Sequence, residues 1–125
     1  MEEYIVLYHG TDVDSALDIL NNGLNAEHLL ALQTGRLVQI RTGWYTARDT
    51  DVAWFFASLA PGDKGRGYAV IEIHLKVSDL EKLLVRGLAI QSAIRNVPFI
   101  AEQVWFDVAA FELLNSRAEF RPYTG

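Results

Sequence analysis

The sequence predicts a single α+β domain that spans residues 1–125, and three observations carry this prediction. The chain has 125 residues, of which 50% are hydrophobic and 22% are charged, so it has a globular composition and enough apolar side chains to form a core. Short segments with strand-like patterns are interspersed with segments of helical spacing. No internal repeat, low-complexity tract or linker separates these segments.

The N-terminal third predicts a strand, a turn and a helix. Residues 4–8 are β-branched, aromatic or leucine, which predicts a strand. His9-Gly10-Thr11 is expected to form a turn at the end of that strand. The helix has Asp14 as its expected N-cap and Gly23 as its stop. Its apolar residues recur at helical spacing: Val13, Ala16, Leu17, Leu20 and Leu24.

The middle of the chain begins with a stretch of weak periodicity over residues 25–43, where we expect a short helix and a loop. Residues 43–47 predict a short strand. The cluster Asp49-Thr50-Asp51 is suited to capping, and it predicts a helix over residues 52–60. Residues 68–75 alternate between apolar and polar side chains, which predicts a half-buried strand.

The C-terminal third predicts one helix and two strands. Ser78 and Glu81 have the spacing of a capping box, which predicts a helix over residues 79–85. Residues 100–107 and 108–114 are rich in apolar and aromatic side chains. They predict two further strands on either side of Asp107.

Composition and charge exclude several classes of function. The formal net charge is −5, which disfavours sequence-independent binding to nucleic acids. The absence of cysteine excludes a thiolate nucleophile and a cysteine-ligated zinc site. His9, His28 and His74 lack metal-ligand spacing, so no metal is expected. No uncharged run reaches the roughly 18 residues that a membrane span needs. Because the N-terminus has no pattern typical of a secretion signal, we expect a cytoplasmic protein, with delivery into a target cell as an alternative.

Three sequence patterns occur in a fixed order along the chain. The first is LYHGT followed by ALDILNNGL, the second is GWYTARDTDVAWFFA, and the third is AEQVWFDVAAFELL. Together they resemble the catalytic domain of ADP-ribosyltransferases of the diphtheria-toxin and poly(ADP-ribose) polymerase type, which carry His, Tyr and Glu on three strands. The resemblance implies two small, mostly antiparallel sheets splayed around an NAD cleft, with flanking helices. It also implies that NAD is the substrate.

The resemblance assigns the catalytic roles to His9, Tyr45 and Glu102. Cleavage of the nicotinamide–ribose bond passes through an oxocarbenium-like transition state, so a carboxylate beside the ribose stabilises the developing positive charge. We assign this role to Glu102, with Glu72 and Glu112 as rival carboxylates. His9 is expected to bind the adenosine ribose.

The remaining binding roles follow from the same resemblance. Gly10 would offer its backbone N–H and C=O to the carboxamide of nicotinamide, and Thr11 would hold the turn. Tyr45 and Phe55 would sandwich the nicotinamide ring, with Trp54 or Phe56 as alternatives to Phe55. Gly43 fills the glycine position of the second pattern. Arg41 would meet the pyrophosphate or, equally well, lie on the surface. A serine that grips the carboxamide in polymerases is replaced by Val52.

The resemblance implies an NAD-dependent mono-ADP-ribosyltransferase that acts as a microbial or phage toxin or effector. The short interval between Tyr45 and Glu102 favours transfer of a single ADP-ribose over chain elongation. The acceptor is a protein, a nucleic acid or a small molecule, and a neutralising antitoxin or immunity protein is an expected partner. An NAD glycohydrolase and a non-catalytic module that binds NAD or ADP-ribose are the alternatives.

Overall fold

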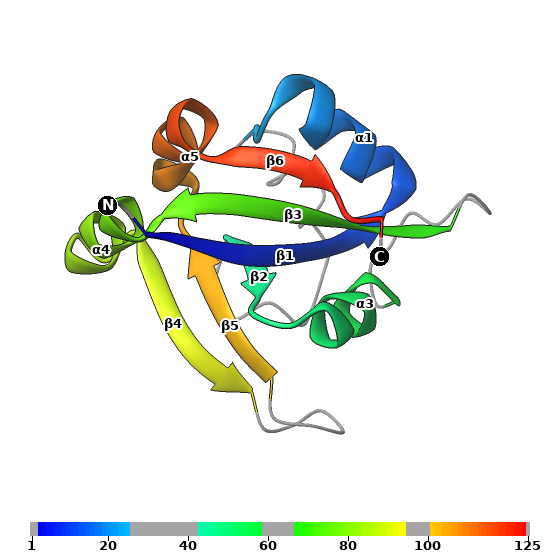
Figure 1. The fold of residues 1–125 in the computed structure, drawn as a ribbon, viewed down its shortest axis with the longest axis horizontal. Helices are drawn as coiled ribbons and strands as arrows, with labels where there is room; N and C mark the ends of the chain where they lie inside the picture. Colours follow the sequence, from blue (N-terminus) through cyan, green and yellow to red (C-terminus); the bar gives the residue numbers. More distant parts are fainter. Residues whose placement is uncertain (1–2, 26–42, 59–66, 95–100, 125) are drawn as a thin grey trace.

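The computed structural model describes residues 3–25, 43–58, 67–94 and 101–124. In these ranges the chain is α+β, with six strands in one antiparallel sheet and four α-helices (Figure 1). The helix and loop expected within residues 25–43 lie almost wholly outside the described residues. None of the helices in these ranges is both long enough and apolar enough to cross a membrane.

The sheet has the strand order β4-β5-β2-β1-β3-β6. Strand pairing is antiparallel throughout. The strands are β1 Tyr4–Asp12, β2 Trp44–Ala47, β3 Tyr68–Lys76, β4 Ala89–Ile94, β5 Ala101–Phe106 and β6 Glu119–Pro122.

The two halves of this sheet meet at a narrow seam between β1 and β2. β1 pairs with β3 along its full length, from Tyr4 opposite Lys76 to Asp12 opposite Tyr68. In contrast, β1 pairs with β2 only where Tyr8 lies opposite Ala47. Figure 1 shows β4 and β5 running at a steep angle to β1 and β3. The expectation of two separate sheets is therefore corrected to one sheet with two three-stranded halves, because this single pair joins them.

The first strand is longer than its sequence pattern predicts. His9, Gly10 and Thr11 do not form a turn: they continue β1 and pair with Ile71, Val70 and Ala69 of β3. The matching length of β3 supplies partners for these residues, which local sequence does not reveal.

Helix α1 (Val13–Asn22) follows β1 without a loop, and its N-cap is Asp12 instead of the expected Asp14. The Asp12 carboxylate accepts a hydrogen bond from the Ser15 N–H at 3.0 Å and another from the Thr11 hydroxyl at 3.3 Å. The helix ends at Gly23, as expected, where a φ of 80° favours glycine.

The first residues of two other helices can be compared with the predicted N-caps. Helix α3 (Thr50–Ser58) begins as expected, with the Asp49 carboxylate accepting the Asp51 N–H at 2.7 Å. Helix α4 (Val77–Val85) begins directly after β3, so the expected capping box at Ser78 is wrong. The N–H of Val77 instead donates to the Glu3 carbonyl, because β1 runs alongside the end of β3.

The second of the two predicted C-terminal strands is wrong. β5 ends at Phe106, and the Asp107 carboxylate accepts the Ala109 N–H, which caps a short 3₁₀ turn over Val108–Ala110. Helix α5 (Phe111–Arg117) follows, and it buries Phe111 and Leu114. The chain then returns as β6 along the outer edge of β3.

Two hydrophobic clusters lie on the sheet. The larger cluster joins β1, β2, β3 and β5 to α4 and α5, and it includes Leu7, Trp44, Ile73, Phe106 and Leu114. The smaller cluster consists of Ala47, Val52, Ala53 and Val70, and it places α3 against the sheet beside the seam. The seam is thus flanked by the main core and by α3.

Candidate functional site

His9 spans the seam between the two halves of the sheet. Its Nδ1 lies 2.7 Å from the backbone carbonyl oxygen of Tyr45 on β2. Its Nε2 accepts a hydrogen bond from the indole N–H of Trp44 at 3.1 Å. The His9 and Trp44 rings also stack at a tilt, with centroids 4.4 Å apart. Both ring nitrogens of His9 therefore have partners within the protein.

These two partners fix the tautomer of His9. An indole N–H can only donate, so Nε2 must be the accepting nitrogen and Nδ1 must carry the proton that the Tyr45 carbonyl accepts. Burial of the ring lowers the pKa of His9 to about 4, against smaller opposing effects of the Tyr45 carbonyl and Asp12. His9 is therefore neutral at physiological pH, where it can accept a hydrogen bond at Nε2 but cannot act as a cationic group.

Gly10 lies where α3 crosses the sheet. A Cβ at this position would stand 1.8 Å from the Ala53 carbonyl oxygen and 3.0 Å from the Ala57 Cβ, so glycine is required for helix packing. On β3, the Val70 carbonyl accepts the Tyr123 N–H on the β6 side. The pair of Gly10 and Val70 is thus not a hydrogen-bonded pair, and the N–H and C=O of Gly10 point toward β2. This is the orientation that the expected contact with a carboxamide needs.

Thr11 and Gly43 have structural explanations that the sequence did not suggest. The buried Thr11 hydroxyl supports the Asp12 cap of α1, so it holds the start of a helix and not a turn. Gly43 is buried against β5, where a Cβ would lie 1.8 Å from the indole Nε1 of Trp105.

Tyr45 and Glu102 lie on neighbouring strands but project from opposite faces of the sheet. Tyr45 pairs with Trp105, whereas Glu102 lies three residues earlier on β5 and pairs with Ala93. Because side chains alternate along a strand, the Tyr45 ring shares a face with Trp105, and the Glu102 carboxylate lies on the other face. By the same alternation across the pair of Tyr8 and Ala47, His9 shares the face of Glu102.

Glu102 is exposed, and its backbone carbonyl accepts the N–H of Arg48, which directly follows β2. The three strands that carry His9, Tyr45 and Glu102 are adjacent in the sheet. The structure therefore brings these strands together and joins His9 to Tyr45, but it does not place the three side chains on one face.

The candidates for the second stacking residue lie on α3. Phe55 is half-buried and Trp54 is 41% exposed, whereas the side chain of Phe56 is outside the described residues. Arg41 also lies outside them. Val52, at the position of the polymerase serine, is buried in the smaller cluster.

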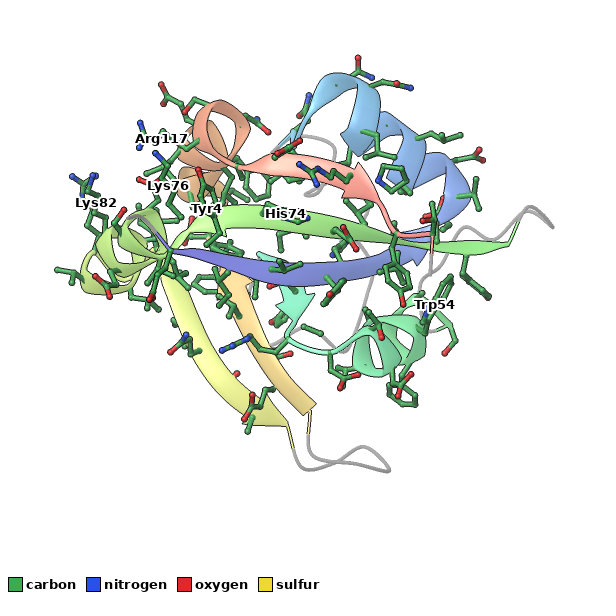
Figure 2. The ribbon with its side chains drawn as sticks, viewed as in Figure 1. Tyr4, Trp54, His74, Lys76, Lys82 and Arg117 are labelled. Carbon is green, nitrogen blue, oxygen red and sulfur yellow. The ribbon has the colours of Figure 1, made fainter. Side chains whose placement is uncertain are left out.

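The rival carboxylates are placed differently. Glu112 lines a groove between α4 and α5 together with Lys82 and Arg117. Figure 2 shows Lys82 and Arg117 at the opposite end of the molecule from Trp54 on α3. Glu72 lies 3.1 Å from the His74 Nε2, and burial together with the Glu72 carboxylate raises the pKa of Tyr8. Glu72 therefore lies near the seam, while Glu112 is remote from it.

The contact of Trp44 with His9 is not among those that the sequence patterns predict. Trp44 is buried, with 3% of its surface exposed, and its indole N–H donates to His9. The adjacent position of Trp44 and Tyr45 on a strand that neighbours β1 was the one available signal. Among the described residues, no group of three His, Asp or Glu side chains is arranged to hold a metal ion.

The seam thus combines a neutral imidazole whose accepting nitrogen is held by Trp44, a glycine backbone directed toward β2, and the aromatic ring of Tyr45, with α3 packed alongside. Such a set can bind hydroxyl groups, an amide and a flat ring. No protein-family model, no curated protein and no solved structure matches this chain.

Proposed function

We propose that this protein is an NAD-dependent mono-ADP-ribosyltransferase of the His-Tyr-Glu class. The observation that carries the proposal is the seam: three adjacent strands bear the three sequence patterns, and the sheet divides between the first and the second of them. His9 and Gly10 lie on one side of this division and Tyr45 on the other. A ligand of the proposed site must contact side chains on both faces of the sheet, because His9 and Glu102 lie on one face and Tyr45 on the other.

In this proposal the nicotinamide end of NAD lies near Gly10, on the face that α3 covers. The carboxamide has both a donor and an acceptor, which match the C=O and N–H of Gly10. Tyr45 supplies one aromatic face for the ring, and Phe55 or a neighbour on α3 supplies the other. Such stacking contributes roughly 0.5–1.5 kcal/mol per ring beyond the buried area.

Glu102 has the role of stabilising positive charge on the ribose as the glycosidic bond breaks. Nicotinamide leaves as a neutral pyridine, so no general acid is required, and the pKa of His9 excludes it from that role at neutral pH. Preorganised groups aimed at charge that develops in the transition state typically contribute factors of about 10²–10³ in rate. An acceptor nucleophile, or water in a glycohydrolase, then attacks the ribose carbon.

The test is release of nicotinamide from NAD by the purified protein, with and without cell lysate as a source of acceptors. We expect Glu102→Gln to lower the rate by roughly 10²-fold or more, because it removes the negative charge but retains the shape. Glu112→Gln is the matched control on a remote exposed glutamate and should leave the rate unchanged. Glu72→Gln tests the rival carboxylate near the seam.

Each outcome assigns a different function. Stimulation of release by lysate indicates a transferable acceptor, and equal release without lysate favours a glycohydrolase. Loss of activity in Glu72→Gln but not in Glu102→Gln would move the catalytic role to Glu72. The absence of both release and NAD binding would contradict the proposal.

The second candidate is a module that binds NAD or ADP-ribose without catalysis. The observation that favours it is the exposed position of Glu102 on the face opposite to the Tyr45 ring. Saturable NAD binding without nicotinamide release, in the wild type and in Glu102→Gln alike, would support this module over the transferase.

A further inference from the structure

Trp44 and His9 are hydrogen-bonded to each other at the seam. The Trp44 indole N–H donates to His9 Nε2, and the His9 Nδ1–H donates to the Tyr45 carbonyl. Neutral imidazole has one accepting nitrogen, with one lone pair in the plane of the ring. With Trp44 in place, the accepting position of His9 is already filled.

The surroundings of Trp44 explain why its N–H uses this acceptor. The indole packs against three apolar rings, with centroids 6.3–6.5 Å away, namely Phe106, Phe111 and Phe120. None of these rings offers a conventional acceptor, and a buried donor without a partner is costly. The hydrogen bond to His9 therefore satisfies the indole and fixes the imidazole at the same time.

This arrangement conflicts with simple addition of a ligand to His9. A ribose hydroxyl that donates to Nε2 must take the position of the Trp44 N–H. The indole must then turn toward an oxygen of the ligand, or remain buried with its donor unpaired. The bound and ligand-free states consequently differ in the partner of one defined N–H group.

We propose that Trp44 is a positioning residue that acts through His9: its indole N–H occupies the accepting nitrogen of His9 until a ribose hydroxyl of the dinucleotide replaces it. The inference rests on the proposed function, because it assumes that His9 receives a ribose hydroxyl. In the ligand-free protein Trp44 keeps His9 in the tautomer and orientation that the ligand uses. The exchange of partners lowers affinity, since binding must first break the Trp44–His9 hydrogen bond.

The first test compares affinities for ADP-ribose, which carries both ribose groups but cannot release nicotinamide. Trp44→Phe retains an aromatic ring in the core and removes the N–H donor. We expect it to bind ADP-ribose roughly ten-fold more tightly by calorimetry, because no competitor remains at Nε2 while the Tyr45 carbonyl still holds the Nδ1–H tautomer of His9. Phe111→Leu is the matched control: it loosens the packing around Trp44 but keeps the N–H, so its affinity should equal that of the wild type.

The second test uses the wild-type protein and needs no folded variant. The ¹⁵N-labelled protein has three indole N–H resonances from its three tryptophans, and saturation with ADP-ribose should shift that of Trp44 by breaking its bond to His9. Long-range ¹⁵N spectra of His9 should show the same Nδ1–H tautomer before and after. A loss of core packing alone would not produce this pair of signals.

The outcomes separate this inference from the proposed function. Binding that leaves the Trp44 resonance unmoved, or a Trp44→Phe variant that folds but binds no more tightly, overturns the exchange while the site stands. Failure of the wild type to bind ADP-ribose at all overturns both. Tighter binding by Trp44→Phe together with the shifted indole resonance supports the exchange.

Discussion

His9 shows how one side chain can serve both the fold and a site. It joins β1 to β2 through the Tyr45 carbonyl at the point where regular pairing between these strands has stopped. Because its other nitrogen accepts from Trp44, protonation would place an N–H against an N–H. Protonation of the folded His9 is therefore unfavourable, and this links the stability of the fold to pH.

Stability should decrease as the pH falls from about 6.5 to about 4. Burial lowers the pKa of His9 from 6.5 to about 4, so in this window the unfolded chain binds a proton that the folded chain does not. Stability from His9 is complete above the unfolded pKa and is lost as pH falls toward the folded one, by at most about 3 kcal/mol. Because His9 is half-buried and not fully enclosed, solvent screening reduces this bound. Urea unfolding at pH 7 and pH 4.5 measures the difference.

The control for this prediction is the other described histidine. His9→Gln should flatten the dependence of the free energy of unfolding on pH between 6.5 and 4, whereas His74→Gln should retain it.

Asp12 contributes to stability in a lower pH range. Burial raises the pKa of Asp12, but hydrogen bonds from Ser15 and Thr11 outweigh burial and lower it. Its contribution is therefore lost only as the pH falls below its ordinary value near 4. Equal slopes in the wild type and His9→Gln would refute the role of His9.

Gly10→Ala should destabilise the fold through packing. The added Cβ would meet the backbone carbonyl of Ala53 at 1.8 Å, and backbone cannot move aside as a flexible side chain can. We expect a loss of about 3 kcal/mol, at the upper end for overpacking. Gly87→Ala is the control, since its φ is 73° but no atom lies within 4 Å of the added Cβ. It should cost about 1 kcal/mol. Equal losses in urea unfolding would contradict this explanation.

Among the elements, α1 and α5 are joined by one side chain. Asn115 on α5 accepts the Leu24 N–H at 2.8 Å and donates to the Leu24 carbonyl at 2.9 Å. It thereby fixes the segment that leaves α1. Gly23 accommodates the contact, since a Cβ there would lie 2.8 Å from the Asn115 Oδ1.

Asn115→Ala should cost about 2 kcal/mol, because both backbone groups of Leu24 lose their partner. Asn115→Asp should cost at least as much, since it removes the donor and brings a negative charge to the Leu24 carbonyl. Asn22→Ala is the control: Asn22 is exposed and its amide donates to Asp18 one turn earlier in the same helix, so the change should remain within about 0.5 kcal/mol. Urea midpoints provide the comparison, and faster hydrogen exchange at the Leu24 amide locates the effect. An unchanged Leu24 amide would show that Asn115 does not hold this segment.

An element can be predicted from the sequence when local residues determine it, and it is missed when distant residues do. Residues 68–75 alternate in polarity, and they form β3 as predicted. Residues 108–114 contain a short apolar run, which fits a strand or a buried helix equally by periodicity. The Asp107 cap and the good helix formers Ala109, Ala110 and Leu114 were the signals that could have identified α5. β6 is short and polar, and it exists because the edge of β3 is available to it.

At the scale of the whole molecule, the sequence correctly predicted an α+β arrangement but not the single sheet. The two halves form one sheet only because Tyr8 on β1 pairs with Ala47 on β2, and no local sequence pattern specifies this pair. The same limit applies to the site. The three patterns identified which residues to examine, while the contact of Trp44 with His9 and the opposite faces of Tyr45 and Glu102 arise only from the register of neighbouring strands. The proposed site is therefore a property of the seam and not of any one element.

The seam should be the weakest part of the sheet, and a ligand across it should strengthen it. Leu7 and Ile73 lie in the continuous β1–β3 ladder, whereas Tyr8 and Ala47 form the isolated pair. We expect the Tyr8 and Ala47 amides to exchange hydrogen at least ten-fold faster than those of Leu7 and Ile73, because local separation of the halves exposes them.

Saturating ADP-ribose should reduce this difference, because it would contact β1 and β2 together. At a ligand concentration 100 times Kd the folded state gains about 2.7 kcal/mol, which raises Tm on the order of 10 °C for a chain of this size. Hydrogen exchange followed by mass spectrometry or NMR, with calorimetry for Tm, tests both effects on the same samples. A rise in Tm without slower hydrogen exchange at Tyr8 and Ala47 would show that the ligand binds away from the seam. Equal exchange rates at all four amides in the ligand-free protein would show that the two halves of the sheet separate only when the whole fold opens.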